Sequence, residues 1–322
     1  MGRVGLVFGG GGVVGHAFHA GVLAALAEIG FDPRAAEVIL GTSAGSWVGV
    51  YLRAGLAAAD LAAATSGEPC SPAGERLFEP VRAAGPIPPP TPVVGWERLP
   101  LVRTGSPALL ARLARRPWEA RLGIVAAAAL PAGRRSTACF VAGLDPLFPG
   151  GAWPERSLWI TAIRLDTGGR VVFGAPGAPT VSVGQAVAAS CAMPSFFEPL
   201  VVEGVRHADG GCHSPTNLDL LAGCGLDLVI VSSPMSGGDG RQPRRRLHGL
   251  ELRSEATRVR RSGTEVIAIE PDAGLVALMG RDSMDETRRR PVVAATRELA
   301  RRRFAAEPGV RSGTESECEK AE

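Results

Sequence analysis

The chain has 322 residues, of which 45% are apolar, 21% charged and only 5% aromatic, with a formal net charge of +3. This composition excludes a disordered chain and argues against an aromatic-rich nucleic-acid reader, so we expect no nucleic-acid partner. No stretch reaches the ~20 uncharged apolar residues that a membrane-spanning helix needs. The six cysteines show no CxxC pair and no metal-ligand spacing, which predicts reduced thiols in a cytoplasmic protein, without metal or cofactor.

The first fifty residues repeat one local pattern. An apolar run typical of a strand, Val4 to Phe8, leads into the glycine-rich segment 9–15, and helical spacing of apolar residues follows over 17–29. A second β-type run at 37–40 leads into Gly41-Thr42-Ser43-Ala44-Gly45 and another apolar helix. Strand, tight turn and helix, twice over, predict a parallel sheet covered by helices.

The middle of the chain changes character. Residues 66–107 are rich in proline, which predicts an irregular segment that covers the site and does not continue the sheet. The remaining elements are predicted from apolar spacing and turn signals: helices at 107–116, 121–130, 183–191 and 292–304, and strands at 157–165, 170–173, 200–202, 226–232 and 264–270.

The pentapeptide around Ser43 has the pattern G-x-S-x-G at a strand-to-helix turn. Such a turn is so sharp that the residues beside the serine must be nearly free of side chain, and Gly41 and Gly45 meet that demand. The following helix directs its N-terminal amides toward the serine. An ordinary glycine-rich turn is the alternative, but the flanking strand and helix favour a nucleophile.

The earlier glycine segment fits two functions. Gly10-x-Gly12-x-x-Gly15 matches the weak dinucleotide-binding pattern, but the second predicted strand ends without the carboxylate that would hold a ribose. The same backbone could present free amides to an oxyanion, which a serine nucleophile on the neighbouring strand requires. We therefore favour an oxyanion hole over a dinucleotide site or a loop that only permits close packing.

A serine nucleophile needs a base, and two residues are candidates. His248 would give the chain order of α/β-hydrolases, but it follows three arginines in a segment that we interpret as solvated. Asp209 precedes Gly210-Gly211 after an apolar strand, where a tight turn would allow a close approach. A simple Asp-Gly turn is an equal alternative on these residues alone. His207 could tune Asp209, although a plain structural histidine is the more common case.

Three motifs in order resemble the patatin-like phospholipases: the glycine run at 9–15, G-T-S-A-G at 41–45 and D-G-G at 209–211. The resemblance also includes residues 188–199 and Ser-Pro-Thr-Asn at 214–217. One position departs from the family, which usually has Arg or Lys where this chain has Val14.

The resemblance implies a three-layer α/β/α sandwich with a mainly parallel sheet. It implies one catalytic domain over 1–304 with a variable lid region at 66–135, and we predict that residues 305–322 form a disordered acidic tail. It further implies that Ser43 and Asp209 form a catalytic dyad and that Gly10, Gly11 and Gly12 are oxyanion donors, supported by the glycines at 15, 41, 45, 210 and 211. The implied function is hydrolysis of lipid carboxylic esters, in the manner of a phospholipase A or lysophospholipase. A catalytically silent lipid-binding or scaffold relative and an acyltransferase are the alternatives.

The predicted helix at 292–304 carries Arg297, Arg301, Arg302 and Arg303. Such a face could contact an anionic lipid surface, where each basic residue contributes ~1 kcal/mol, and would place the protein peripherally at the inner membrane face. A solvated helix end that complements the helix dipole is an equal alternative.

Overall fold

A computed structural model describes residues 2–86 and 105–307. Eight strands form one sheet in the order β5-β6-β3-β2-β1-β7-β8, with β4 paired to β3. The strand bounds are β1 Val4–Phe8, β2 Val38–Gly41, β3 Ser157–Arg164, β4 Arg170–Phe173, β5 Leu200–Val202, β6 Val205–Asp209, β7 Leu228–Ser232 and β8 Glu265–Ile269. The strands from β3 to β8 along this order are parallel, whereas β4, β5 and β6 pair in antiparallel fashion. The predicted mainly parallel sheet is confirmed.

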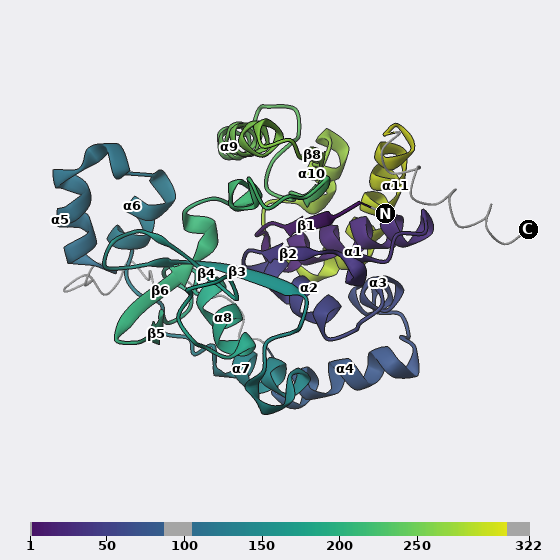
Figure 1. Cartoon of the computed structure of the whole chain (residues 1–322), viewed down its shortest axis with the longest axis horizontal. Coiled ribbons are helices and arrows are strands. Elements are labelled where there is room, and N and C mark those ends of the chain that lie inside the picture. Colours follow the sequence, from purple (N-terminus) through teal and green to yellow (C-terminus); the bar gives the residue numbers. More distant parts are fainter. Residues whose placement is uncertain (1, 87–104, 308–322) are drawn as a thin grey trace, which may run out of the picture.

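Helices cover the sheet in two layers. Their bounds are α1 Gly12–Glu28, α2 Ala44–Arg53, α3 Ala58–Ser66, α4 Pro72–Ala83, α5 Pro107–Arg115, α6 Leu122–Ala129, α7 Ala138–Leu144, α8 Val183–Ser190, α9 Pro243–Arg261, α10 Ala273–Met279 and α11 Arg289–Ala305. Figure 1 shows the α5–α6 pair and α11 at opposite ends of the long axis, with the sheet between them.

Alternation along the strands assigns each helix to a layer. In β1, Leu6 and Phe8 belong to the core formed with α1, α2, α8 and α11, whereas Val7 belongs to a second core with α9. Ile163 of β3 packs with α5 and α6 in a third core. Successive side chains of a strand point to opposite faces, so α9 and the α5–α6 pair share one face and α1, α2 and α11 the other. This is the expected three-layer α/β/α arrangement.

One expected segment differs from the structure. Residues 72–83 form α4, although the proline-rich stretch 66–107 was predicted to be irregular. Pro72 occupies the first turn, where its missing amide costs nothing, and Ser71 caps the helix by accepting from the Gly74 amide. Helix α4 packs on α7 rather than over the site, with the Cα of Val81 close to Gly143. Residues 87–104 lie outside the described part.

Most of the remaining predicted elements have boundaries close to the observed ones, but α1 begins at Gly12, five residues before the predicted start at residue 17. Helix α11 ends at Ala305, one residue beyond the predicted domain boundary at 304, so the predicted tail at 305–322 begins within this helix; residues 308–322 lie outside the described part. The division into domain, lid and tail therefore stays a prediction. Within the described residues, no helix is both long and apolar enough to cross a bilayer.

Candidate active site

Strand register brings Ser43 and Asp209 to one place. Gly41 of β2 pairs with Ile160 of β3, so that a residue two positions further along β2 is level with Ala162. Ala162 in turn pairs with Asp209 on the other edge of β3. The central strand thus lies between the two residues, and both leave the sheet at the same level. A separation of 166 positions in the sequence is closed by two strand pairings.

The backbone at Ser43 is strained in the way that a nucleophile turn requires. Ser43 has φ +52° and ψ −118°, a region that costs a non-glycine residue about 1–3 kcal/mol. A Cβ on Gly45 would lie 2.0 Å from the Phe8 carbonyl oxygen, and one on Gly41 would lie 2.6 Å from the Ser46 Cα. Only glycine fits at either position. The amide of Ser43 donates to Ser190 Oγ at 2.8 Å, which fixes the turn against α8.

Asp209 is a buried carboxylate whose partners are neutral. It is 6% exposed, and its Oδ1 accepts from the Gly211 amide at 2.7 Å. Burial raises the pKa of Asp209 to about 6, and the hydrogen bonds from Gly211 and from the Ser43 side chain only partly oppose that shift. No cation among the described residues contributes to this pKa. A carboxylate with a raised pKa beside a hydroxyl is suited to accept its proton.

The glycine loop lies against Ser43, but its three amides differ. A Cβ on Gly10 would lie 3.5 Å from Ser43 Cβ, so the loop backbone packs directly on the serine. The Gly10 amide donates to the Pro215 carbonyl at 2.9 Å, which corrects its predicted role as a free oxyanion donor. The amides of Gly11 and Gly12 begin α1 and have no acceptor within the described residues. They remain the expected donors.

The residue after Ser43 adds a donor that was not among the predicted ones. Ala44 is the first residue of α2, and its amide has no acceptor in the described part of the chain. The residue after a serine nucleophile supplies such a donor in other hydrolase folds. The G-x-S-x-G turn itself contained this signal, because the first amides of a helix are always unpaired within it. Positive ends of two helices, α1 and α2, therefore meet at Ser43.

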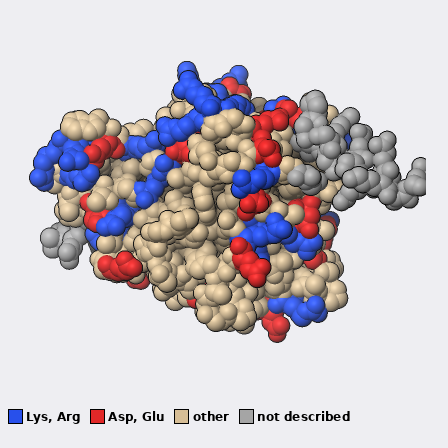
Figure 2. Space-filling view, viewed as in Figure 1, with Lys and Arg blue, Asp and Glu red and all other residues tan. Residues whose placement is uncertain are grey.

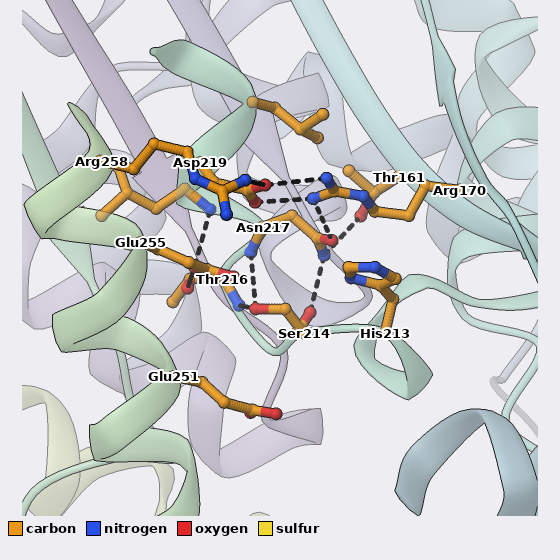
Figure 3. A network of polar contacts seen from close by, with 12 residues as sticks. Thr161, Arg170, His213, Ser214, Thr216, Asn217, Asp219, Glu251, Glu255 and Arg258 are labelled. Atoms are coloured by element: carbon orange, nitrogen blue, oxygen red, sulfur yellow. Dashed lines mark hydrogen bonds and ion pairs between the residues drawn. The ribbon is translucent and has the colours of Figure 1, made fainter. Parts of the chain in front are cut away.

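Asn217 joins the three segments that carry the site. It is fully buried, has φ +51°, and lies at the centre of the network in Figure 3. Its Nδ2 lies 3.2 Å from Thr42 Oγ1, 3.3 Å from Thr161 Oγ1 and 2.6 Å from the Ser214 carbonyl oxygen. The hydroxyl oxygens of Thr42 and Thr161 are hydrogen-bonded to each other at 2.8 Å. Asn217 thus ties the turn before Ser43 to β3 and to the segment after Asp209.

A second carboxylate in the same network is ion-paired. The Asp219 carboxylate accepts two hydrogen bonds from Arg170, at 2.6 Å and 2.8 Å (Figure 3). It accepts a third, at 3.1 Å, from Arg258 of α9. Burial opposes ionisation of Asp219, but the hydrogen bonds and charge of Arg170 outweigh it and lower the pKa. Glu255 accepts from the Thr216 hydroxyl at 2.6 Å and from the Leu218 amide at 3.0 Å. This network fixes the segment that follows Asp209.

The histidines have structural contacts. His19 Nε2 donates to the Gly9 carbonyl at 2.7 Å, so its Nδ1 accepts from the Ser232 hydroxyl at 2.7 Å. Burial lowers the pKa of His19 to about 3, which keeps this tether neutral. His207 contacts the Val205 carbonyl oxygen, and burial lowers its pKa as well. His248 lies on α9 against Glu251 at 3.1 Å, and Arg244 and Arg246 before it are exposed, as expected for the solvated segment predicted here.

The other residues singled out in the sequence have ordinary environments. Val14 is buried in the large core, where the aliphatic side chain packs and a cation would be desolvated. Burial and the charge of Asp209 raise the pKa of the Cys191 thiol to about 12, which leaves it unreactive. Asp166 pairs with Arg164 in the hairpin turn. Within residues 2–86 and 105–307 no cluster of His, Cys, Asp and Glu could hold a metal ion.

Comparison with known proteins agrees with this geometry. The family model described as Patatin-like phospholipase matches residues 6–222, about two thirds of the chain. The matched range contains the glycine loop, the serine turn and the Asp-Gly-Gly segment. No curated protein matches the chain significantly.

Proposed function

The chain belongs to the patatin-like phospholipase family, a family of lipid acyl hydrolases, and on this basis we propose that it hydrolyses carboxylic esters of lipids with Ser43 as nucleophile and Asp209 as base. The observation that carries the proposal is that Ser43 and Asp209 leave the sheet at the same level on either side of β3, with the Ser43 side chain hydrogen-bonded to the buried Asp209 carboxylate. Each pKa unit above the ordinary aspartate value lowers the cost of proton transfer to the carboxylate by ~1.36 kcal/mol.

The reaction proceeds in two steps. In the first, the Ser43 oxygen attacks the ester carbonyl while Asp209 takes the hydroxyl proton, and that proton passes to the departing alcohol as the acyl-serine forms. In the second, Asp209 takes a proton from water, the hydroxide attacks the acyl carbon, and the proton returns to Ser43 as the carboxylic acid leaves. No cofactor enters either step.

The developing oxyanion requires donors that are already aligned. The unpaired amides of Gly11, Gly12 and Ala44 support this role, since they lie at the N-termini of two helices beside Ser43. One such donor typically contributes ~2.7–4 kcal/mol to the transition state. An aspartate remains a weak base for a hydroxyl even at a pKa of about 6, so we infer that these amides supply much of the rate.

The test compares wild type with Ser43→Ala and Asp209→Asn on a soluble short-chain ester and on phospholipid micelles. We expect both variants to lose at least about a thousandfold in kcat/KM. Asp166→Asn is the matched control, because Asp166 lies in an exposed hairpin turn and its loss leaves the site intact. Full activity of Ser43→Ala would remove the proposal. Activity on the soluble ester but transfer of the acyl group to an alcohol in preference to water would instead identify an acyltransferase.

Peripheral membrane contact is the second part of the proposal, and α11 is poorly suited to it. Arg297 pairs with Glu28, Arg301 and Arg302 pair with Glu298, and Arg303 pairs with Glu307. Each arginine of the predicted basic face therefore already has a carboxylate partner. These contacts favour the alternative of a solvated helix end over a membrane-facing one. Cytoplasmic placement stays a prediction.

A further inference from the structure

Two large apolar side chains protrude from the connection between α5 and α6. Trp118 is 78% exposed and Leu122 is 76% exposed, the highest values among the large apolar residues of the described chain. Trp118 lies in a short 3-10 turn, Pro117–Glu119, and Leu122 is the first residue of α6. Single exposed apolar residues are common, but a tryptophan and a leucine four residues apart on a projecting hairpin indicate an interaction surface.

Arginines surround these two side chains. Residues 107–130 contain four arginines and a single carboxylate, Glu119, which pairs with Arg112 and Arg116 at 3.0 Å each. Arg115 makes no ion pair with any described residue, and its Nε donates to the Ala111 carbonyl. Figure 2 shows blue side chains gathered over this end of the molecule and over α9. The surface is therefore apolar at its tip and positive around it.

The hairpin packs directly on the candidate active site. Gly123 is so close to the segment after Asp209 that an added Cβ would lie 2.2 Å from the Cys212 carbonyl oxygen. Arg121 donates to the His213 carbonyl at 3.1 Å. The hairpin that carries the exposed tip is thus fixed against the segment that follows Asp209.

Helix α9 extends the same surface. It covers the same face of the sheet as the hairpin, and its Glu251 lies 3.9 Å from Arg121. Its exposed face adds Leu250, which is 52% exposed, and Arg244.

We propose that the α5–α6 hairpin, with the first half of α9, docks on a bilayer that contains anionic phospholipid and thereby presents the active site to its substrate. Trp118 and Leu122 enter the boundary between headgroups and acyl chains, where tryptophan is favoured, and Arg115, which forms no ion pair with a described residue, contacts a lipid phosphate. Leu122 beside Trp118 favours lipid over nucleic acid, since a leucine offers a base no stacking surface. The link to catalysis rests on the proposed function, whereas docking itself does not.

The test is cosedimentation of the full chain with vesicles of phosphatidylcholine alone and of phosphatidylcholine with phosphatidylglycerol. We expect binding only to the anionic vesicles, a loss of about tenfold or more for Trp118→Ser/Leu122→Ser, and a loss of about fivefold for Arg115→Gln. Val201→Ser, which changes an apolar residue 60% exposed on β5, and Arg301→Gln/Arg302→Gln on α11 serve as controls and keep wild-type binding.

Three results would overturn the docking surface: no binding of wild type to anionic vesicles, unchanged binding of the hairpin variants, or an equal loss in the α11 control. A single-stranded oligonucleotide that binds more tightly than the vesicles and depends on Trp118 would also replace the bilayer as partner. Brominated lipid should quench the fluorescence of wild type more than that of Trp118→Phe, which places the side chain in the membrane directly. Fluorophosphonate labelling of Ser43 in the absence of vesicles separates the two proposals. Binding to vesicles without labelling would support the docking surface and contradict the proposed hydrolase function.

Discussion

Two aspartates of the same polar region have opposite electrostatic environments. Asp209 has only neutral donors, the Gly211 amide and the Ser43 side chain, and burial raises its pKa to about 6. Asp219, ten positions later, is held by Arg170 and Arg258, and its pKa is lowered despite burial. Both carboxylates accept hydrogen bonds in a low-dielectric environment, and the presence or absence of a cation decides whether the pKa of each is lowered or raised.

The difference between the two environments distinguishes a carboxylate suited to a structural role from one suited to proton transfer. A carboxylate held by two guanidinium groups stays ionised and keeps its partners in place, but it has little affinity for a proton. A carboxylate held by amides and a hydroxyl retains that affinity, at a cost in stability when it ionises at neutral pH. We infer that Asp219 positions the segment after the site and that Asp209 takes part in the reaction.

The largest expected effect comes from replacing the Asp209 carboxylate with an amide. Asp209→Asn should reduce kcat/KM for a soluble ester by about a thousandfold or more, because the substitution removes the carboxylate that contacts Ser43. The same variant should gain up to about 3 kcal/mol of unfolding free energy at pH 7, since the buried charge is removed. Urea unfolding and initial rates check both. A variant that loses stability while retaining activity would reverse the roles assigned to the two aspartates.

Removing the cation from Asp219 should have the next largest effect. Arg170→Met leaves a buried carboxylate with one exposed partner, and we expect about 3 kcal/mol of destabilisation in urea unfolding. Arg258→Gln is the matched control, since that side chain is 66% exposed and its pair with Asp219 contributes less than about 1 kcal/mol. Equal effects of the two substitutions would contradict the structural role of the buried pair.

Asn217 connects the two environments, and its loss should affect both moderately. Asn217→Gly suits the positive φ of this residue but removes the amide that joins Thr42, Thr161 and the Ser214 carbonyl. We expect kcat to fall by about 10–100-fold through misplacement of Ser43, with KM much less changed. A change in KM alone would show that Asn217 acts on substrate binding rather than on the dyad.

The pH profile should reveal the raised pKa of Asp209. Only the ionised carboxylate accepts a proton, so kcat/KM should rise about tenfold per pH unit below pH 6 and level off above it. Folding stability has the opposite sign: a raised folded-state pKa means that the contribution of Asp209 is greatest below about pH 4 and is lost as the pH rises toward 6. An ascending limb centred near pH 4 would indicate a solvated Asp209.

The smallest effect is expected on α11. Glu298→Gln removes the partner of Arg301 and Arg302 on an exposed helix face, and the unfolding free energy should change by less than about 1 kcal/mol. Because α11 lies outside the proposed docking surface, the variant should also keep wild-type affinity for anionic vesicles. A gain in affinity would show that α11 contacts the bilayer as well.

The features that could be predicted from sequence are those that depend on local geometry. The glycines beside Ser43 reflect a turn with no room for a Cβ, and the apolar strands reflect a sheet covered on both faces. Both constraints act within a few residues, so they can be recognised in the sequence. The parallel sheet covered by helices and the place of Ser43 at a strand-to-helix turn followed from these local signals, whereas the three-layer α/β/α fold was implied by the resemblance to the patatin-like phospholipases.

The features that were not predicted depend on residues distant in sequence or on weak local patterns. Helix α9 has only a short apolar stripe, Leu252, Ala256 and Val259, among many arginines, so its helical period was not visible. The role of Asn217 arises from strand register, which brings Thr42 and Thr161 together. The Gly10 amide was assigned to the oxyanion because its acceptor, the Pro215 carbonyl, lies some 200 positions away.

The central claim is that Ser43 and Asp209 act as a pair, and the pH dependence of covalent labelling tests it most directly. A fluorophosphonate should react with wild type, and mass spectrometry should locate the adduct on Ser43. We predict a labelling rate that increases with pH around 6 in wild type and is slow and independent of pH over that range in Asp209→Asn. An adduct on another residue, or the same profile in both proteins, would contradict the pairing.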